Sequence, residues 1–167
     1  MSMSGQMRME QRMKLAPRMI QSMAQALDSS WAGRAPDLPL VDKRQALTLA
    51  SIVEREARVP QERPLIAGVF LNRLRRHWYL ESCATVEYAL GSWKARLRYK
   101  DLQVDSPYNT YRHPGLPPGP ICNPGAASLE AASHPEKTDM MFFVAEGGGA
   151  HQFSRYYKEH LAVQRKK

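Results

Sequence analysis

The stretch SIVERE, residues 51–56, lies within the pattern that decides the fold. Around it the apolar residues recur at helical spacing, at Ala46, Leu49, Ala50, Val53 and Ala57. This period predicts an amphipathic helix over residues 43–58. Asp42 precedes the helix as an N-cap residue, and Gln45 follows three positions later, which is typical of a capping box. We therefore expect a helix with one buried face.

The same stretch carries two carboxylates, Glu54 and Glu56. Because successive residues of a helix turn by about 100°, the two cannot share a face. Glu56 lies on one flank of the apolar stripe, where partial burial raises the pKa of a carboxyl group, as a general acid requires. Glu54 lies on the other flank with Arg58 as an ion-pair partner at i,i+4. Solvated surface positions are the alternative for both, and the outward residues are expected to be Thr48, Ser51, Arg55 and Arg58.

The rest of the chain is predicted to be mainly helical. Pro60 and Pro64 fit the first turn of a helix that buries the apolar residues up to Leu74. β-like runs at 140–145 and 151–154 flank a turn of three glycines and predict a small C-terminal β hairpin. We expect an α+β domain over residues 13–167, after a loose segment at 1–12. The other helices are expected at 13–31, 85–90, 125–133 and 156–167.

Residues 105–125 hold six prolines and three glycines and are predicted to form a long ordered loop. Such loops inside compact domains are usually functional. Tyr108, Asn109, Thr110 and Tyr111 offer hydroxyls, an amide and flat rings that can bind sugars. Alternatively, the two tyrosines fill a core below the loop. His151 and Phe153 lie on one side of the last strand, and the histidine is either a structural donor or a catalytic group.

Composition excludes several classes of function. The net charge of +8 favours anionic partners, and Arg73, Arg75 and Arg76 form one basic cluster, most simply explained as a solvated helical face. Nucleic-acid binding is not expected, since zinc-finger spacing, Gly-rich phosphate loops and RNP-like motifs are absent. Cys83 and Cys122 show no CxxC spacing and the histidines no ligand pattern, so no metal or cofactor is expected. No apolar run approaches the length of a membrane-spanning helix, and no signal core is visible.

Three runs together resemble the YceG-like (MltG) family of endolytic murein transglycosylases. They are LASIVEREARVPQERPLIAGVFLNRL (49–74), SPYNTYRHPGLPPGPICNPGAASLEAASHP (106–135) and FFVAEGGGAHQFS (142–154). The similarity extends over roughly residues 13–163. The resemblance implies a lyase that cleaves the MurNAc–GlcNAc bond within peptidoglycan glycan strands and leaves 1,6-anhydro-MurNAc ends.

The resemblance also assigns the site. The second Glu of the family's IVEKE-like motif is the catalytic acid/base and matches Glu56. The substrate-binding residues implied with it are Glu54, Asn72, Glu81, Cys83, Tyr108, Asn109, Thr110, Tyr111, His151 and Phe153. The implied location is the extracytoplasmic face of the bacterial cell membrane, with synthases of the elongation machinery as partners. From the resemblance we expect the chain to correspond to the family's catalytic region, without the membrane anchor and LysM-like subdomain.

One segment departs from the family pattern. Where the family has LQ, then Ser or Thr, then DPTV, this chain reads LESCATV at residues 80–86. Glu81 replaces Gln, Cys83 replaces Asp, and Ala84 replaces Pro. The loss of a carboxylate at Cys83 motivates a second hypothesis, a peptidoglycan-binding module with weakened catalysis.

Overall fold

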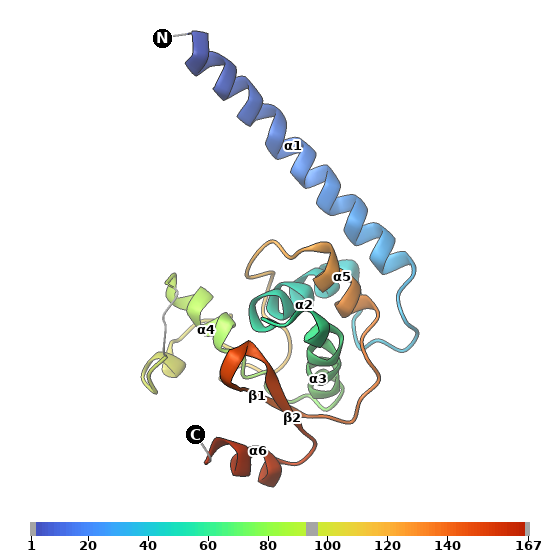
Figure 1. The fold of residues 1–167 in the computed structure, drawn as a ribbon, viewed down its shortest axis with the longest axis vertical. Helices are drawn as coiled ribbons and strands as arrows, with labels where there is room; N and C mark the ends of the chain where they lie inside the picture. Colours follow the sequence, from blue (N-terminus) through green and yellow to red (C-terminus); the bar gives the residue numbers. More distant parts are fainter. Residues whose placement is uncertain (1–2, 93–96, 166–167) are drawn as a thin grey trace.

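The computed structural model describes residues 3–92 and 97–165, and its first element is a long helix, α1 (Met3–Ala32). Figure 1 shows α1 projecting away from a body that the later elements form. At its C-terminal end Ser30 is buried, and its hydroxyl donates to the carbonyl of Leu129 at 3.0 Å. The helix begins at Met3 rather than Met13 and includes residues expected to be loose, since Met, Gln, Arg and Glu are good helix formers. In the described ranges, no helix combines the length and apolar character that crossing a bilayer requires.

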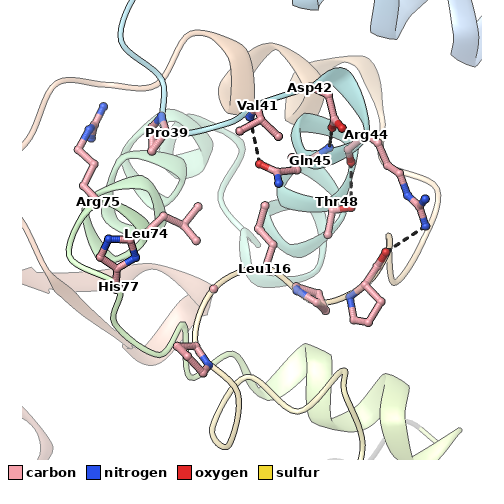
Figure 2. A pocket seen from close by; sticks show the side chains of 14 residues that line it. Pro39, Val41, Asp42, Arg44, Gln45, Thr48, Leu74, Arg75, His77 and Leu116 are labelled. Carbon is pink, nitrogen blue, oxygen red and sulfur yellow. Dashed lines mark hydrogen bonds between the residues drawn. The ribbon is translucent and has the colours of Figure 1, made fainter.

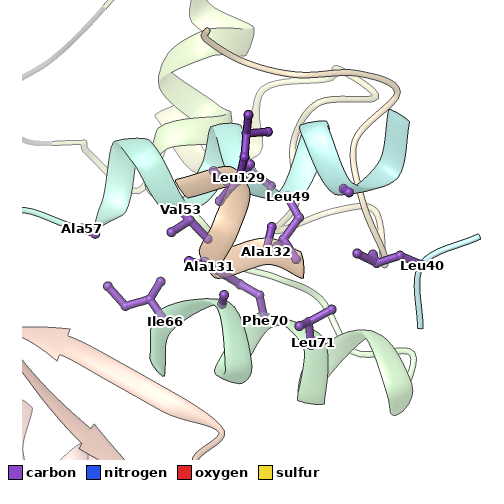
Figure 3. Close-up of a cluster of buried hydrophobic side chains, with 14 of the residues drawn as sticks. Leu40, Leu49, Val53, Ala57, Ile66, Phe70, Leu71, Leu129, Ala131 and Ala132 are labelled. Atoms are coloured by element: carbon purple, nitrogen blue, oxygen red, sulfur yellow. The ribbon is translucent and has the colours of Figure 1, made fainter. Parts of the chain in front are cut away.

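The core lies where a short helix, α5 (Ala126–Ser133), packs against α2 (Lys43–Glu56) and α3 (Arg63–Arg75). Figure 3 shows apolar side chains from all three helices meeting there. The large, fully buried ones include Leu49, Ile52, Ile66, Phe70, Leu71 and Leu129. Burial of each such side chain contributes roughly 1.5–3 kcal/mol relative to exposure. The predicted apolar stripe of the second helix is confirmed.

Helix α2 begins as predicted and ends two residues early. Asp42 accepts the amide N–H of Gln45 at 2.8 Å, and the Gln45 side chain accepts the amide of Val41 at 3.1 Å. Ala57 is extended, so Glu56 is the last residue of the helix. The extended backbone at Val59 is what a residue before proline prefers. A 3₁₀ turn, η1 (Pro60–Glu62), then leads directly into α3.

Helix α3 contains a buried cation, contrary to the expected solvated cluster. Arg73 is 7% exposed. Its guanidinium pairs with Glu81 at 2.9 Å and donates to three backbone carbonyls at 2.8–3.1 Å, those of Tyr79, Leu80 and Met141. Arg73 therefore joins α3 both to the segment before α4 (Cys83–Leu90) and to the C-terminal hairpin.

The hairpin forms as predicted, with β1 (Phe142–Ala145) antiparallel to β2 (His151–Ser154). Ala145 pairs with His151, and the turn between them includes η3 (Gly147–Gly149) with Gly148 at φ 83°, a left-handed conformation that glycine adopts freely. Phe143 packs edge-on against Phe70 of α3 with ring centroids 5.5 Å apart. Helix α6 (Tyr157–Gln164) follows. The α+β class is confirmed.

The Pro/Gly segment 105–125 contains neither helix nor strand, as expected, and follows the turn η2 (Asp101–Gln103). It covers a face of α2 that was predicted to point outward. Ser51 is fully buried, and its hydroxyl accepts the amide of Ile121 at 2.9 Å. Thr48 is 2% exposed. The outward prediction is wrong for both residues. For Ser51 the loop supplies a partner that the helical period cannot reveal, while the Thr48 hydroxyl donates to the Arg44 carbonyl of its own helix.

Candidate active site

Glu56 lies at the end of α2 and faces the start of α4. The Ser82 hydroxyl donates a very short hydrogen bond to Glu56 Oε1, and the amide N–H of Ala84 donates to the same carboxylate. Ser82 is the N-cap residue of α4, yet its side chain does not cap its own helix. The Glu56 carboxylate therefore takes the place of an N-cap side chain, where the partial positive charge of a helix start favours an anion.

Two opposing effects act on the proton of Glu56. Burial is the larger effect and raises the pKa of the carboxyl above its ordinary value. The bonds from Ser82 and Ala84 and the charge of His151 act against it, because they stabilise the anion. Glu56 thus holds its proton more tightly than an exposed Glu, while donors stand ready for the anion it leaves. This combination is suited to a group that gives up and regains a proton.

Cys83 and Tyr111 lie beside this carboxyl group. The Cys83 thiol and the Tyr111 hydroxyl are 3.2 Å apart. Burial raises the pKa of both groups, and the charge of Glu56 raises each of them further. The thiol and the phenol are therefore neutral hydrogen-bonding groups at neutral pH, placed next to Glu56.

His151 approaches Glu56 from the hairpin. Its charge acts on the Glu56 carboxylate. Its ring Nδ1 lies 2.7 Å from Glu62 Oε2, and its amide N–H donates to Glu62 Oε1 at 3.0 Å. Phe143 lies edge-on to the imidazole at 5.3 Å, and Phe153 lies on the same strand with its ring centroid 6.3 Å from the imidazole. The structure thus places His151 and Phe153 near one another, as the strand period predicted.

Glu54 has a different environment. It accepts the Ser128 hydroxyl at 2.6 Å and the amide N–H of Gly125 at 3.1 Å, while Arg63 lies 4.0 Å away. These donors belong to the start of α5, so Glu54 joins α2 to α5, and it does so instead of pairing with Arg58. The hydrogen bond from Ser128 is the main reason why the pKa of Glu54 is lowered.

We expect Glu54→Ala to lower the free energy of unfolding by about 1–3 kcal/mol at pH 7, the usual cost of removing a charged hydrogen-bond acceptor. The pKa of Glu54 is lower in the folded chain, so its stabilisation is present at neutral pH and is lost as the pH falls through the folded value. Urea denaturation at pH 7 and below about pH 4 checks both parts. Glu146→Ala, at an exposed position, is the matched control.

Several residues expected to bind substrate are engaged in holding the backbone. Asn109 is fully buried, and its amide donates to the carbonyls of Leu102 and Val104, both at 2.9 Å. Thr110 is 1% exposed, and its hydroxyl accepts the amide of Ser82 at 3.0 Å. Asn72 donates to two carbonyls of the chain before the hairpin, those of Thr138 and Met140. The polar side chains of these three residues are therefore engaged in contacts within the protein.

The remaining residues that were expected to bind substrate either pack against other side chains or lie at the surface. Tyr108 is half-buried against the core and lies 4.7 Å from Tyr88, centroid to centroid. This agrees with the alternative that it fills a core below the loop. Glu81 is half exposed, pairs with Arg73, and has a positive φ of 53°. Glu81 directly precedes Ser82 in the chain.

A pocket of about 860 Å³ lies on another part of the molecule. Figure 2 shows it between the start of α2, the end of α3 and the loop, with Arg44 bonded to the Pro118 carbonyl. Its lining includes Leu74, Arg75, His77 and Leu116 but none of the groups around Glu56. The candidate site is therefore the group of side chains around Glu56 and not this pocket. Among the described residues, His, Cys, Asp and Glu form no group of three that could hold a metal ion.

Sequence reasoning missed two residues of the candidate site, Ser82 and Glu62. Ser82 precedes a helix and reads as an ordinary N-cap residue, a signal that predicts its place but not its donation to Glu56. Glu62 lies two residues after Pro60 in η1 and is 89 positions from His151 in the chain. Neither partner could be found from the local pattern.

Comparison with known proteins gives consistent matches. The sequence model of the YceG-like family matches residues 6–166 of this chain. An endolytic murein transglycosylase of Bacillus subtilis is 48% identical over 126 residues, which cover 75% of this chain and 35% of that protein. One of Streptococcus pneumoniae is 39% identical over 107 residues, 61% of this chain and 19% of that protein. The 2.6 Å crystal structure of a YceG-like protein from Listeria monocytogenes has 48% identity and a TM-score of 0.69, covering 72% of this chain and 40% of that one. The chain spans well under half the length of these relatives.

Proposed function

This chain belongs to the YceG-like family, and from that premise we propose that it is a lytic transglycosylase that cleaves peptidoglycan glycan strands internally, between MurNAc and GlcNAc. The observation that carries the proposal is the environment of Glu56. Its carboxyl has a pKa raised by burial and two donors ready to stabilise its anion. Two relatives that match this chain are named endolytic murein transglycosylases.

In the first step, the protonated Glu56 acts as general acid. Its proton passes to the oxygen of the scissile glycosidic bond, the bond from that oxygen to C1 of MurNAc breaks, and the strand leaves with a free hydroxyl. The carboxylate that remains accepts hydrogen bonds from Ser82 and Ala84 at the start of α4. The acetamido group of the sugar supports the positive charge at C1, so a second protein carboxylate is not required, unlike the two-carboxylate glycosidases.

In the second step, Glu56 acts as general base. The C6 hydroxyl of the same MurNAc attacks C1 and gives its proton to the Glu56 carboxylate, which restores the enzyme. The product is a 1,6-anhydro-MurNAc end, and no water is consumed. The neutral thiol and phenol of Cys83 and Tyr111 can donate to sugar hydroxyls beside the reacting bond.

Digestion of un-crosslinked glycan strands in H₂¹⁸O, followed by mass spectrometry of the ends, tests the proposal. We expect new anhydro-MurNAc ends that carry no ¹⁸O, at positions within the strands. Reducing ends labelled with ¹⁸O would show a hydrolase and overturn the lyase mechanism. Release from strand ends alone would overturn internal cleavage.

The second candidate function is a binding module with weakened catalysis. The observation that favours it is the thiol of Cys83, beside Glu56, at the position where the family carries Asp. Sedimentation with purified sacculi without product release would support this function. Recovery of cleavage in Cys83→Asp combined with Ala84→Pro would identify the segment responsible.

The site of action that we propose is the extracytoplasmic face of the bacterial cell membrane, where new glycan strands are made. Synthases of the elongation machinery are the partners proposed there. Co-purification with such synthases from membranes tests this part separately from the chemistry.

A further inference from the structure

We propose that Glu62 is a positioning residue for the reaction, acting by holding His151 in one tautomer and one orientation beside Glu56. The inference rests on the proposed role of Glu56 as acid and base. It concerns a residue that the sequence pattern did not select. Glu62 ends the 3₁₀ turn η1, while His151 opens the strand β2.

The contact between Glu62 and His151 fixes both the ring and the backbone of the histidine. One carboxylate oxygen lies 2.7 Å from ring Nδ1 and the other accepts the amide N–H at 3.0 Å. The side chains are 16% and 5% exposed, so solvent competes little for these bonds. Since a carboxylate only accepts hydrogen bonds, Nδ1 carries the proton and Nε2 is the nitrogen left for other partners.

Aromatic packing leaves the imidazole little freedom to turn. The Phe143 ring meets it edge-on at 5.3 Å with an interplanar angle of 89°, and the centroid of Phe153 lies 6.3 Å away. A hydrogen bond from Nδ1 to a carboxylate is a common way in which proteins fix the tautomer and orientation of a functional imidazole.

The consequence for Glu56 is electrostatic. The charged groups that act on its carboxyl are His151 of β2 and Glu87 of α4, while Cys83 and Tyr111 are its neutral neighbours. Because Glu62 holds ring Nδ1 and the backbone N–H of His151, the imidazole that acts on Glu56 is kept in one tautomer and one orientation. Glu62 therefore acts on Glu56 through His151.

Ring ¹⁵N NMR of the whole chain without substrate gives a test that does not depend on the proposed function. We expect the protein to show His151 protonated at Nδ1, and Glu62→Gln to lose this single tautomer. Glu130→Gln is the matched control, since it removes the carboxylate 3.0 Å from the ring of a different histidine, His134. An unchanged His151 tautomer in Glu62→Gln would overturn the inference even if cleavage is confirmed.

Kinetics supply the second test. We expect Glu62→Gln to lower kcat/KM on the order of tenfold, because the imidazole of His151 is no longer held in place. Because the imidazole that acts on the pKa of Glu56 is no longer held in place, the alkaline limb of the pH profile should move. The double variant with His151→Gln should be no slower than His151→Gln alone. If the losses of the two single variants multiply in the double variant, or if the alkaline limb does not move, Glu62 does not act through His151.

If Glu62→Gln fails to fold, Glu62→Asp is expected to retain the Nδ1 tautomer of His151. Absence of this tautomer in Glu62→Asp would equally overturn the inference.

Discussion

Glu56→Gln is expected to abolish cleavage of glycan strands, with a loss of at least about 10²–10⁴-fold, the contribution of general acid–base catalysis. The amide has nearly the same shape as the carboxyl but can neither donate an acidic proton nor take one back. Its carbonyl oxygen can still accept from Ser82. We therefore expect the site to keep its shape while losing its reaction. Product analysis of un-crosslinked strands measures the effect.

The same variant is expected to be more stable than the parent protein at neutral pH. The pKa of Glu56 is higher in the folded than in the unfolded chain, because burial disfavours the anion. The protonated carboxyl is therefore well accommodated at low pH, and stability is lost as the pH rises through the folded value. Urea denaturation should show a stability gain for Glu56→Gln at pH 7 that disappears near about pH 4.

Glu54→Gln serves as the control for this pair of measurements. It changes a carboxylate two residues away that bonds with α5 and not with α4. We expect it to lower stability and to keep cleavage. Equal cleavage by Glu56→Gln and the parent protein would contradict the assignment of the acid and base.

Arg73→Met is expected to have the largest effect on stability, a loss of about 3–5 kcal/mol in the free energy of unfolding, because several acceptors lose their donor together. The methionine fills similar space but leaves the half-exposed Glu81, the buried carbonyls of Leu80 and Met141 and the partly buried carbonyl of Tyr79 without that donor. Each unsatisfied buried acceptor costs about 1–3 kcal/mol. We expect these individual losses to overlap in part, so they do not simply add to the total. Thermal and urea denaturation measure the change.

Arg75→Met is the matched control, because Arg75 lies on the same helix and is exposed. It donates to the carbonyl of Asp37 and the side chain of Asn72, both at the surface. We expect a change within about 0.5 kcal/mol, as for other surface substitutions. Similar losses in the two variants would show that burial of Arg73 does not decide stability.

The sequence allowed the elements to be predicted because local signals define them. The apolar period predicted α2, the N-cap residue Asp42 predicted where α2 begins, and the prolines predicted where α3 begins. The separation of Glu54 from Glu56 was also predictable, since helical geometry alone puts them on different faces. In the structure Glu54 bonds with the start of α5, and Glu56 bonds with the start of α4.

The missed features depend on contacts between distant parts of the chain. Ser51 looked exposed because the helical period describes one helix and not the loop that covers it. Arg73 looked solvated because its partners at Tyr79, Leu80 and Met141 are carbonyls, which every residue has. Sequence pattern carries no information on which of them an arginine will reach.

The groups around Glu56 come from segments as far apart as η1, the start of α4, the Pro/Gly loop and β2. Closing contacts between such distant segments costs chain entropy, so they form slowly compared with the helices themselves. The arrangement of side chains around Glu56 is therefore expected to form late in folding, after the helices, when the hairpin brings His151 against Glu62.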